Sequence, residues 1–284
     1  MKFNSLYLKR LMAFSVISTS VFGLVGCGSA TETNGESVNS NNQSAIEVSI
    51  LDKDKLIVGI DDAFPPMGFR DENGEITGFD IDFANAMSEK LGKELEFQTI
   101  DWTMKEAELN AGNIDLIWNG YSISDKRREQ VDFSVPYLKN KQVILTMADS
   151  TIETKADLAG KVVGAQAGST AVDAVETEPE VRESFKDGKV VTYENNNDVL
   201  MDLEAGRLDA VVADEVLIKY YINKKGAEKF KILEENFGEE EYGVGMRKGD
   251  TAFLEAFNTA YEELKADGTL TKLSQEWFGQ DIMQ

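Results

Sequence analysis

The feature that most constrains the fold is a run of alternating strand and helix patterns that occurs twice. One run extends from Leu56 to Trp118 and the other from Val162 to Ala213. In each run, short apolar segments typical of buried strands alternate with amphipathic segments that stop at a glycine, such as Gly92 and Gly206. Alternation of this kind predicts parallel βαβ units. Two similar small α/β domains therefore explain the 284 residues better than one large domain.

The composition excludes several kinds of function. The chain has no histidine and one cysteine. This excludes Ser-His-Asp and Cys-His triads, histidine-rich metal sites and internal disulfides. Acidic residues number 51 against 29 basic residues, which gives a formal net charge of -22. Since phosphate binding needs the opposite balance, we expect no nucleic-acid partner.

The N-terminal residues carry the features of an exported and lipid-anchored protein. Residues 1–26 have a basic start and an apolar run from Leu11 to Val25, which is typical of a signal peptide and short for a membrane span. The run ends in Leu-Val-Gly before Cys27 and resembles the lipobox of bacterial lipoproteins, in which the cysteine is lipidated. A plain signal peptide with a chance cysteine is the alternative. Residues 27–50 are then the lipidated cysteine and a flexible tether rich in Ser, Asn, Thr and Gly, and the folded body starts near Lys55.

The stretch from Asp115 to Tyr137 has the composition of a pocket for a small carboxylate. A predicted strand end is followed by Asn119 and Gly120, then by hydroxyl side chains and a short polar helix that contains Arg127. The planar guanidinium of an arginine meets a carboxylate through two parallel hydrogen bonds. An ordinary loop with a surface arginine is the alternative interpretation.

Other conspicuous residues have structural interpretations. Asp80 and Asp82 lie at the predicted start of a helix, where carboxylates suit the helix dipole, so we expect helix capping there rather than a metal pair. Trp118 is expected in the core. The acidic cluster from Glu234 to Glu241 is expected to form a solvated surface loop.

From about Lys55 to the C-terminus, the chain resembles the bacterial extracellular solute-binding proteins of family 3, which bind polar amino acids for ABC importers. The resemblance implies an α/β fold of the two-lobed periplasmic-binding-protein kind (type II), with two βα domains joined by two crossover strands. Residues 51–143 plus 242–284 would form lobe 1 and residues 144–241 lobe 2, with crossings near Gln142–Met147 and Tyr242–Met246. The stretches that carry the resemblance are Gly78–Asp82, Ser122–Arg127 with Val131–Ser134, Asp157–Lys161, Gly168–Thr170 and Gly206–Ala210.

The same resemblance implies how the backbone end of an amino acid would be held. Arg127 is expected to grip the α-carboxylate, helped by Ser122 and Thr170. Asp214 is expected to bind the α-ammonium group together with the carbonyl of Gly120. A zwitterion taken out of water needs both of its charges met by opposite charge. Because Arg127 and Asp214 come from different halves of the chain, a bound amino acid would bridge the halves and favour a closed state.

The ligand side chain is expected between Phe64 and Trp102. The resemblance places Asp61, Asn119 and Gln166 at the end of that side chain, and Ser169 at the edge of the pocket. Asn119 stands where binders of basic amino acids usually carry small hydroxyl residues. Since its amide offers both a donor and an acceptor, it favours a neutral polar or cystine-like side chain, although Asp61 is also compatible with arginine or lysine.

These features together predict the substrate-binding component of an ABC importer. We expect a monomer with no cofactor, no metal and no catalytic residue, held on the extracellular face of the cell membrane by the lipid on Cys27. Its partners would be a polar amino acid and the permease subunits. A Gram-positive surface is favoured, and the periplasmic side applies in a Gram-negative cell. A ligand-binding sensor and a dehydratase-like enzyme on the same scaffold are the alternatives. The enzyme would need a general acid such as Asp61 or Glu215, because no histidine is available.

The lipobox interpretation makes a direct prediction. Replacing Cys27 with serine removes the thiol that would carry the lipid, so the Cys27→Ser protein should leave the membrane fraction and appear in the soluble fraction. Cell fractionation followed by immunodetection measures this. Full retention of the variant in the membrane fraction would contradict lipid anchoring.

Overall fold

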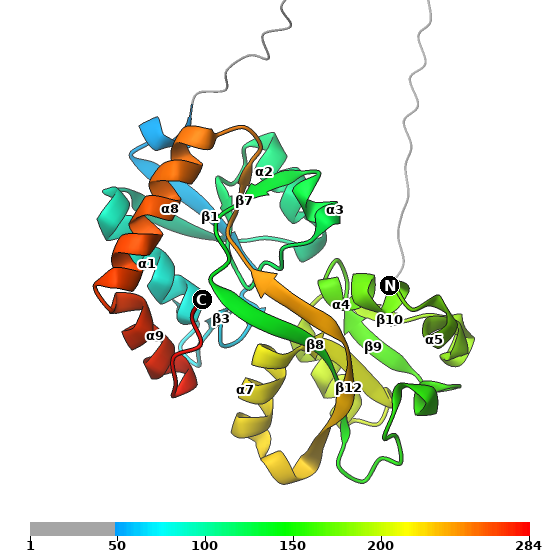
Figure 1. The fold of residues 1–284 in the computed structure, drawn as a ribbon. Helices are drawn as coiled ribbons and strands as arrows, with labels where there is room; N and C mark the ends of the chain where they lie inside the picture. The colour runs from blue at the N-terminus through cyan, green and yellow to red at the C-terminus, as the bar shows by residue number, and fades with distance from the viewer. Residues whose placement is uncertain (1–48) are drawn as a thin grey trace, which may run out of the picture. The chain divides into compact units, whose positions relative to one another are not determined.

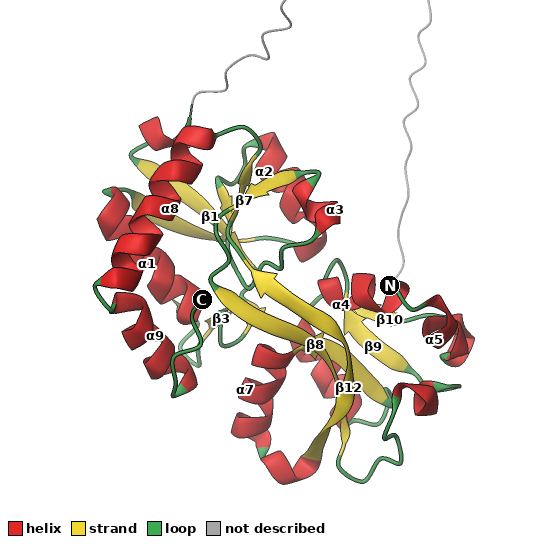
Figure 2. Ribbon diagram, in the orientation of Figure 1, coloured by secondary structure: helices red, strands yellow, loops and turns green. Residues whose placement is uncertain are grey.

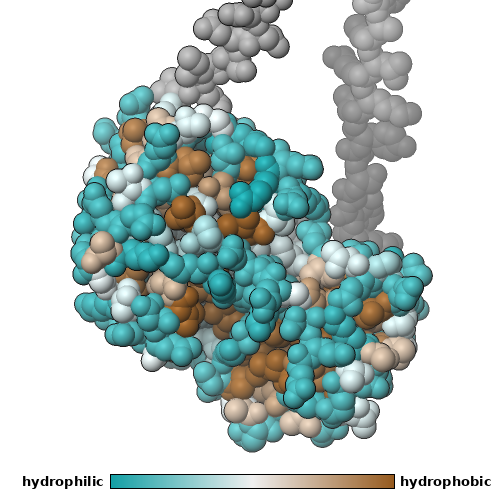
Figure 3. Space-filling view, viewed as in Figure 1, coloured by the Kyte–Doolittle hydropathy of each residue, from teal (hydrophilic) through white to brown (hydrophobic). Residues whose placement is uncertain are grey.

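The structure is a computed structural model that describes residues 49–284. The predicted signal peptide, Cys27 and most of the tether lie outside the described residues. Within residues 49–284, no helix combines the length and the apolar character that crossing a membrane requires. The face seen in Figure 3 is mostly hydrophilic, with apolar groups scattered among the polar ones.

The first lobe is built on a five-stranded mixed sheet (Figures 1 and 2). Strand β1 pairs in parallel with β5 and β6, whereas β13 is antiparallel to β6 and β7. The strands, in spatial order, are β5 (Glu94–Thr99), β1 (Lys55–Ile60), β6 (Leu116–Ile117), β13 (Gly245–Arg247) and β7 (Val131–Phe133). The helices of this lobe are α1 (Phe79–Leu91), α2 (Lys105–Ala111), α3 (Asp125–Arg128), α8 (Thr251–Ala266) and α9 (Thr269–Phe278). Its smaller elements are a three-stranded sheet of β2 (Ala63–Phe64), β3 (Gly68–Arg70) and β4 (Ile76–Thr77) and the short 3-10 helices η1 (Ile50–Asp52) and η2 (Trp102–Met104).

The second lobe repeats the plan with a second five-stranded sheet. Strand β9 is parallel to β10 and β11, and β8 is antiparallel to β11 and β12. The strands, in spatial order, are β10 (Val191–Tyr193), β9 (Val163–Gln166), β11 (Ala210–Asp214), β8 (Leu138–Met147) and β12 (Phe230–Tyr242). The helices are α4 (Thr170–Glu176), α5 (Pro179–Ser184), α6 (Asn196–Glu204) and α7 (Glu215–Lys225), with 3-10 helices η3 (Lys155–Leu158), η4 (Lys186–Gly188) and η5 (Ala227–Lys229). The α/β fold predicted from the alternation of strand and helix patterns is therefore confirmed.

Two long antiparallel strands, β8 and β12, connect the lobes (Figure 1). At the lobe boundary Leu138 pairs with Tyr242, and each also bridges to the first lobe, Leu138 to Met283 and Tyr242 to Ser122. The first crossing thus lies a few residues before the expected segment Gln142–Met147.

The acidic cluster of residues 234–241 is not the solvated surface loop that its charge suggests. All of these residues belong to the 13-residue strand β12, in which exposed and buried positions follow one another. Glu240 is half-buried and pairs in register with Asn140 of β8. The loop prediction was wrong because a charge run in a strand can expose one face and place the other against a neighbour.

The folded body begins earlier than the expected start near Lys55. Ile50 is 2% exposed and packs in the core. The Ser49 hydroxyl donates to Asp250 Oδ1 at 2.6 Å, and the Ile50 N–H donates to Asp250 Oδ2 at 2.8 Å. Asp250 is also the N-cap residue of α8. The last residues of the expected tether therefore dock on the start of α8.

Asp115 anchors the strand that leads into the candidate pocket. Its carboxylate is buried and accepts hydrogen bonds from Lys53 Nζ at 2.7 Å and Arg247 Nη2 at 2.9 Å. The Ile57 N–H donates to its other oxygen at 3.1 Å. Three donors compensate the burial of this carboxylate. Without it, the donors would be left without a hydrogen-bond partner. Asp115 thus fixes β6 against β1 and β13.

Candidate functional site

One cavity between the lobes is lined by all eleven residues that the sequence assigned to a ligand. Its volume is only about 10 Å³, so the lining side chains nearly fill it in this closed arrangement. The residues follow the carboxyl ends of strands: Asp61 comes directly after β1, Gln166 ends β9 and Asp214 ends β11. Ligands of open α/β sheets bind at this edge of the sheet. The lining residues are Asp61, Phe64, Trp102, Asn119, Gly120, Ser122, Arg127, Gln166, Ser169, Thr170 and Asp214.

Arg127 is a buried cation with a fixed orientation. It is 4% exposed and lies on the short helix α3, whose N-cap Ser124 accepts a hydrogen bond from the Arg127 N–H. The guanidinium donates to the carbonyl of Ser122 at 2.8 Å and to that of Gly168 at 3.3 Å. It stacks over the Tyr121 ring at 4.5 Å from the ring centroid. These contacts hold the planar fork toward the cavity, where it can meet a carboxylate.

Lys105 is a second buried cation beside Arg127, with which it shares the Gly168 carbonyl, but it does not line the cavity. Its Nζ donates to the carbonyls of Trp102 at 2.9 Å and Gly168 at 3.0 Å, so it links the first lobe to the second. Burial lowers the pKa of Lys105 to about 8, and the nearby positive charge of Arg127 acts in the same direction. Sequence reasoning missed this residue because a lysine at the start of a polar helix is usually exposed.

Asp214 is the matching buried anion in the second lobe. It is 5% exposed and its Oδ1 accepts hydrogen bonds from Asn140, Gln142 and the Tyr242 hydroxyl. These donors come from β8 and β12, so the crossover strands position the carboxylate. Sequence reasoning missed all three donors, which lie 28 to 74 residues away along the chain.

The opposite end of the cavity carries amide and carboxyl groups. Gln166 Nε2 donates to Asp61 Oδ2 at 2.6 Å and thereby joins the lobes, while Asn196 donates to Gln166 Oε1 at 2.8 Å. Burial raises the pKa of Asp61 above its ordinary value. Asn119 is 1% exposed, and neither its amide nitrogen nor its amide oxygen has a hydrogen-bond partner among the described residues. Because buried polar groups are nearly always paired, this amide is ready for a ligand.

Gly120 closes the turn between Asn119 and the rest of the site. Its φ is +57°, and a Cβ there would lie 2.7 Å from the Phe64 ring, so only glycine fits. Its N–H donates to Asp80 Oδ2 at 2.6 Å, and the Tyr137 hydroxyl donates to the same oxygen at 2.9 Å. Asp80 therefore supports the pocket wall from behind.

Asp80 and Asp82 lie in the first turn of α1, as expected, but neither of them caps the helix. Gly78 is the N-cap residue of α1, and no side chain forms the cap hydrogen bond. Asp80 is 1% exposed and holds Gly120, while Asp82 accepts from Trp277 Nε1 at 2.8 Å. Among residues 49–284, no group of three or more acidic, histidine or cysteine side chains is placed to hold a metal ion. The core position expected of Trp118 is confirmed, since it is 1% exposed and packs edge-on against Phe83.

Comparisons with known proteins agree with this geometry. The sequence profile of the bacterial extracellular solute-binding proteins, family 3, matches residues 56–280. The chain is 33% identical over 261 residues to the L-cystine-binding protein TcyJ of Escherichia coli, covering 91% of this chain and 96% of TcyJ. It also resembles a substrate-binding protein of a Streptococcus pneumoniae ABC uptake transporter, solved with bound histidine. There the TM-score is 0.80 and the identity 40%, with 82% of this chain and 96% of the other covered. An ancestral arginine-binding protein bound to glutamine gives a TM-score of 0.72 at 39% identity, with coverage of 80% and 99%.

The two-lobed α/β fold with a cavity at the carboxyl ends of its strands defines a type II periplasmic binding protein. The chain belongs to the bacterial extracellular solute-binding proteins, family 3. The family and its relatives are binding proteins and not enzymes, so the dehydratase-like alternative is set aside.

The burial of Asp80 predicts a pH effect on stability. Burial raises the pKa of Asp80 from 3.8 to about 7, despite the hydrogen bonds from Gly120 and Tyr137. The folded protein therefore binds more protons than the unfolded chain between these pH values, and this group makes the free energy of unfolding fall as pH rises. Asp80→Asn cannot ionise. The free energy of unfolding of Asp80→Asn minus that of wild type should therefore be about 1–3 kcal/mol larger at pH 7 than at pH 5.

Urea unfolding of both proteins at the two pH values measures this difference. Glu89→Gln changes an exposed carboxyl on the same helix and serves as the control, with little change expected in the comparison. A stability difference between Asp80→Asn and wild type that is independent of pH would refute the assignment.

Proposed function

We propose that the protein is the substrate-binding component of an ABC importer and that it captures a polar amino acid between its lobes. The strongest support is the pair of buried opposite charges in one cavity, Arg127 in the first lobe and Asp214 in the second. They suit the α-carboxylate and the α-ammonium group of an amino acid. Ser122 and Thr170, whose hydroxyls lie 3.0 Å apart across the lobes, complete the carboxylate end.

The groups at the far end of the cavity favour a neutral polar or cystine-like side chain. Asn119 offers an unpartnered donor and an unpartnered acceptor, whereas the Gln166 amide already bonds to Asp61 and Asn196. Asp61 is present as well, but it is already hydrogen-bonded to Gln166. Phe64 and Trp102 would cover the faces of the side chain. The relatives are named for cystine, or are solved with histidine or glutamine, so this family accepts several polar side chains on a shared scaffold.

The cellular setting completes the proposal. The protein would act outside the cytoplasmic membrane as a monomer, anchored by a lipid on Cys27, and deliver the amino acid to permease subunits. Membership in an extracellular family and the lipobox-like sequence before Cys27 support this arrangement.

A melting screen tests the proposed ligand class. Residues 28–284 are mixed with each common L-amino acid and with L-cystine, and the unfolding temperature is measured against concentration. A ligand that binds only the folded state raises that temperature progressively. We expect one amino acid, or a small group of analogues, to do so. No shift with any of them, in protein freed of co-purified ligand, would contradict amino-acid binding.

The same screen tests Arg127. Removal of one partner from a buried charge pair costs about 2–5 kcal/mol, so Arg127→Ala should lower the affinity for the amino acid at least about 30-fold while the protein stays folded. Arg128→Ala removes the adjacent, exposed arginine and should bind as wild type does. Equal affinity of Arg127→Ala and Arg128→Ala would contradict the assignment of Arg127 to the α-carboxylate of the ligand.

A further inference from the structure

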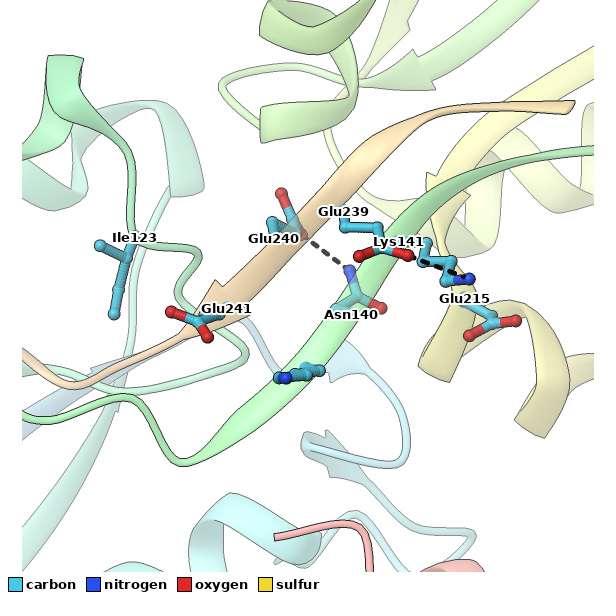
Figure 4. Close-up of a pocket in the computed structure, with 8 residues that line it drawn as sticks. Ile123, Asn140, Lys141, Glu215, Glu239, Glu240 and Glu241 are labelled. Atoms are coloured by element: carbon cyan, nitrogen blue, oxygen red, sulfur yellow. Dashed lines mark hydrogen bonds and ion pairs between the residues drawn. The ribbon is translucent and has the colours of Figure 1, made fainter. Parts of the chain in front are cut away.

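A second carboxylate, Glu240 of crossover strand β12, lies next to Asp214. The Asn140 amide nitrogen is 2.6 Å from Asp214 Oδ1 and 2.7 Å from Glu240 Oε1. The Gln142 amide nitrogen is 3.1 Å and 2.8 Å from the same two oxygens. Because both oxygens lie within hydrogen-bond reach of the same two amides, the carboxyl groups are close neighbours. Figure 4 shows Glu240 directed at Asn140 between the two crossover strands.

No cation in the described part of the chain neutralises this pair directly. Lys141 lies beside Asn140 on β8, but its side chain is on the opposite face and pairs with Glu239 at 3.3 Å (Figure 4). On α7, Lys219 pairs with Glu215 at 2.9 Å.

The more distant charged groups do not neutralise the pair either. Lys139 is in register with Glu241 on the face of the strands away from the cavity. Arg127 attracts Asp214 from the first lobe, but burial and the charge of Glu240 act on that carboxyl more strongly.

The donors around the pair are neutral, and among the described residues they reach one oxygen of each carboxyl, Asp214 Oδ1 and Glu240 Oε1. Ser122 donates to Glu240 at 2.8 Å and Tyr242 to Asp214 at 2.6 Å. The Gln142 amide nitrogen has two hydrogens but three acceptors, since Thr170 Oγ1 is also within 3.2 Å. Burial raises the pKa of Asp214 well above its ordinary value, and the negative charge of Glu240 raises it further. Two carboxyl groups in such proximity cannot both ionise readily.

We infer that Asp214 and Glu240 act as one acidic pair, which holds a single proton before an amino acid binds and releases it when the α-ammonium group arrives. The inference rests on the proposed function of the cavity. In the step, the O–H bond of the pair breaks, the ammonium group keeps its three hydrogens, and the proton passes to solvent. The proton can reach solvent through Glu240, which is half-buried. Glu240 also lines a groove on the outer side of the crossover strands, together with Lys139, Glu239 and Glu241 (Figure 4).

The pair couples amino-acid affinity to pH. The ligand-free protein holds a proton that the complex lacks, so a rise in pH favours the complex. Affinity should increase by up to about tenfold per pH unit until the ligand-free pair has lost its proton. With Glu240 replaced by glutamine, the new amide can donate to Asp214 and the repulsion is gone, so Asp214 should ionise more readily and the dependence should shift to lower pH.

Calorimetry on the full-length chain in detergent measures the proton directly. L-Cystine, L-histidine and L-glutamine are titrated at pH 6 in two buffers that differ in ionisation enthalpy, and the difference in heat gives the protons released. For a bound amino acid we expect close to one proton from wild type and clearly fewer from Glu240→Gln. Glu241→Gln changes the neighbouring carboxylate, which faces the other way, and should match wild type. Binding to wild type without proton release, or equal release from Glu240→Gln, would overturn the inference.

A second readout needs no ligand. In the ligand-free chain labelled with ¹³C in its aspartate and glutamate carboxyl groups, one carboxyl of the pair should still titrate above pH 6, where ordinary carboxyl groups are ionised. This signal should move to lower pH in Glu240→Gln and stay unchanged in Glu241→Gln. If none of the three amino acids binds, the choice of ligand fails while the carboxyl titration still decides the inference. Full ionisation of both groups at pH 6 would refute the acidic pair.

Discussion

The structure depends on the burial of unlike charges on the two sides of one cavity. Arg127 and Asp214 are each almost fully buried, and removal of a charge from water costs several kcal/mol unless other groups compensate. Neither residue pairs with the other. Arg127 is held by carbonyl oxygens, an aromatic ring and the Glu106 carboxylate 3.8 Å from its Nε, and Asp214 by amides and a hydroxyl. A zwitterionic ligand would bring an opposite charge to each of them, and in doing so it would join the two lobes.

The fold provides the supports for these charges from elements far apart in the sequence. Strands β1, β9 and β11 end at the cavity and deliver Asp61, Gln166 and Asp214. Crossover strands β8 and β12 supply the donors to Asp214, so the hinge region and the ammonium end of the cavity are parts of one hydrogen-bond network. A change in the relative position of the lobes would therefore move the side chains that bind the ligand. Ligand binding would in turn alter the hydrogen bonds of the hinge strands.

Local sequence patterns predicted the fold class because strand and helix periodicities act over short distances. The glycine after α1 illustrates this, since Gly92 takes a left-handed φ of 63° and ends the helix where the pattern stops. The residues that line the cavity were found through motifs of a recognisable family, and they do lie together, while their roles toward a ligand stay predictions. Glu240 escaped detection because an acidic run looks solvated until its strand pairing is known. The contact of Asp80 with the pocket wall was not predicted, because its partner Gly120 is 40 residues away and a helix start explains a carboxylate equally well.

The central claim is that an amino acid bridges the lobes, and the distance between them tests it most directly. With Cys27→Ser, the chain has no other cysteine, so Glu89→Cys on α1 and Met201→Cys on α6 can carry a fluorescent donor and acceptor at exposed positions in different lobes. Single-molecule energy transfer then reports how often the lobes are close. An amino acid that stabilises the protein in the melting screen should increase the population with the shorter distance, and Arg127→Ala should abolish this response. Binding of that amino acid with an unchanged distribution of distances would contradict the account.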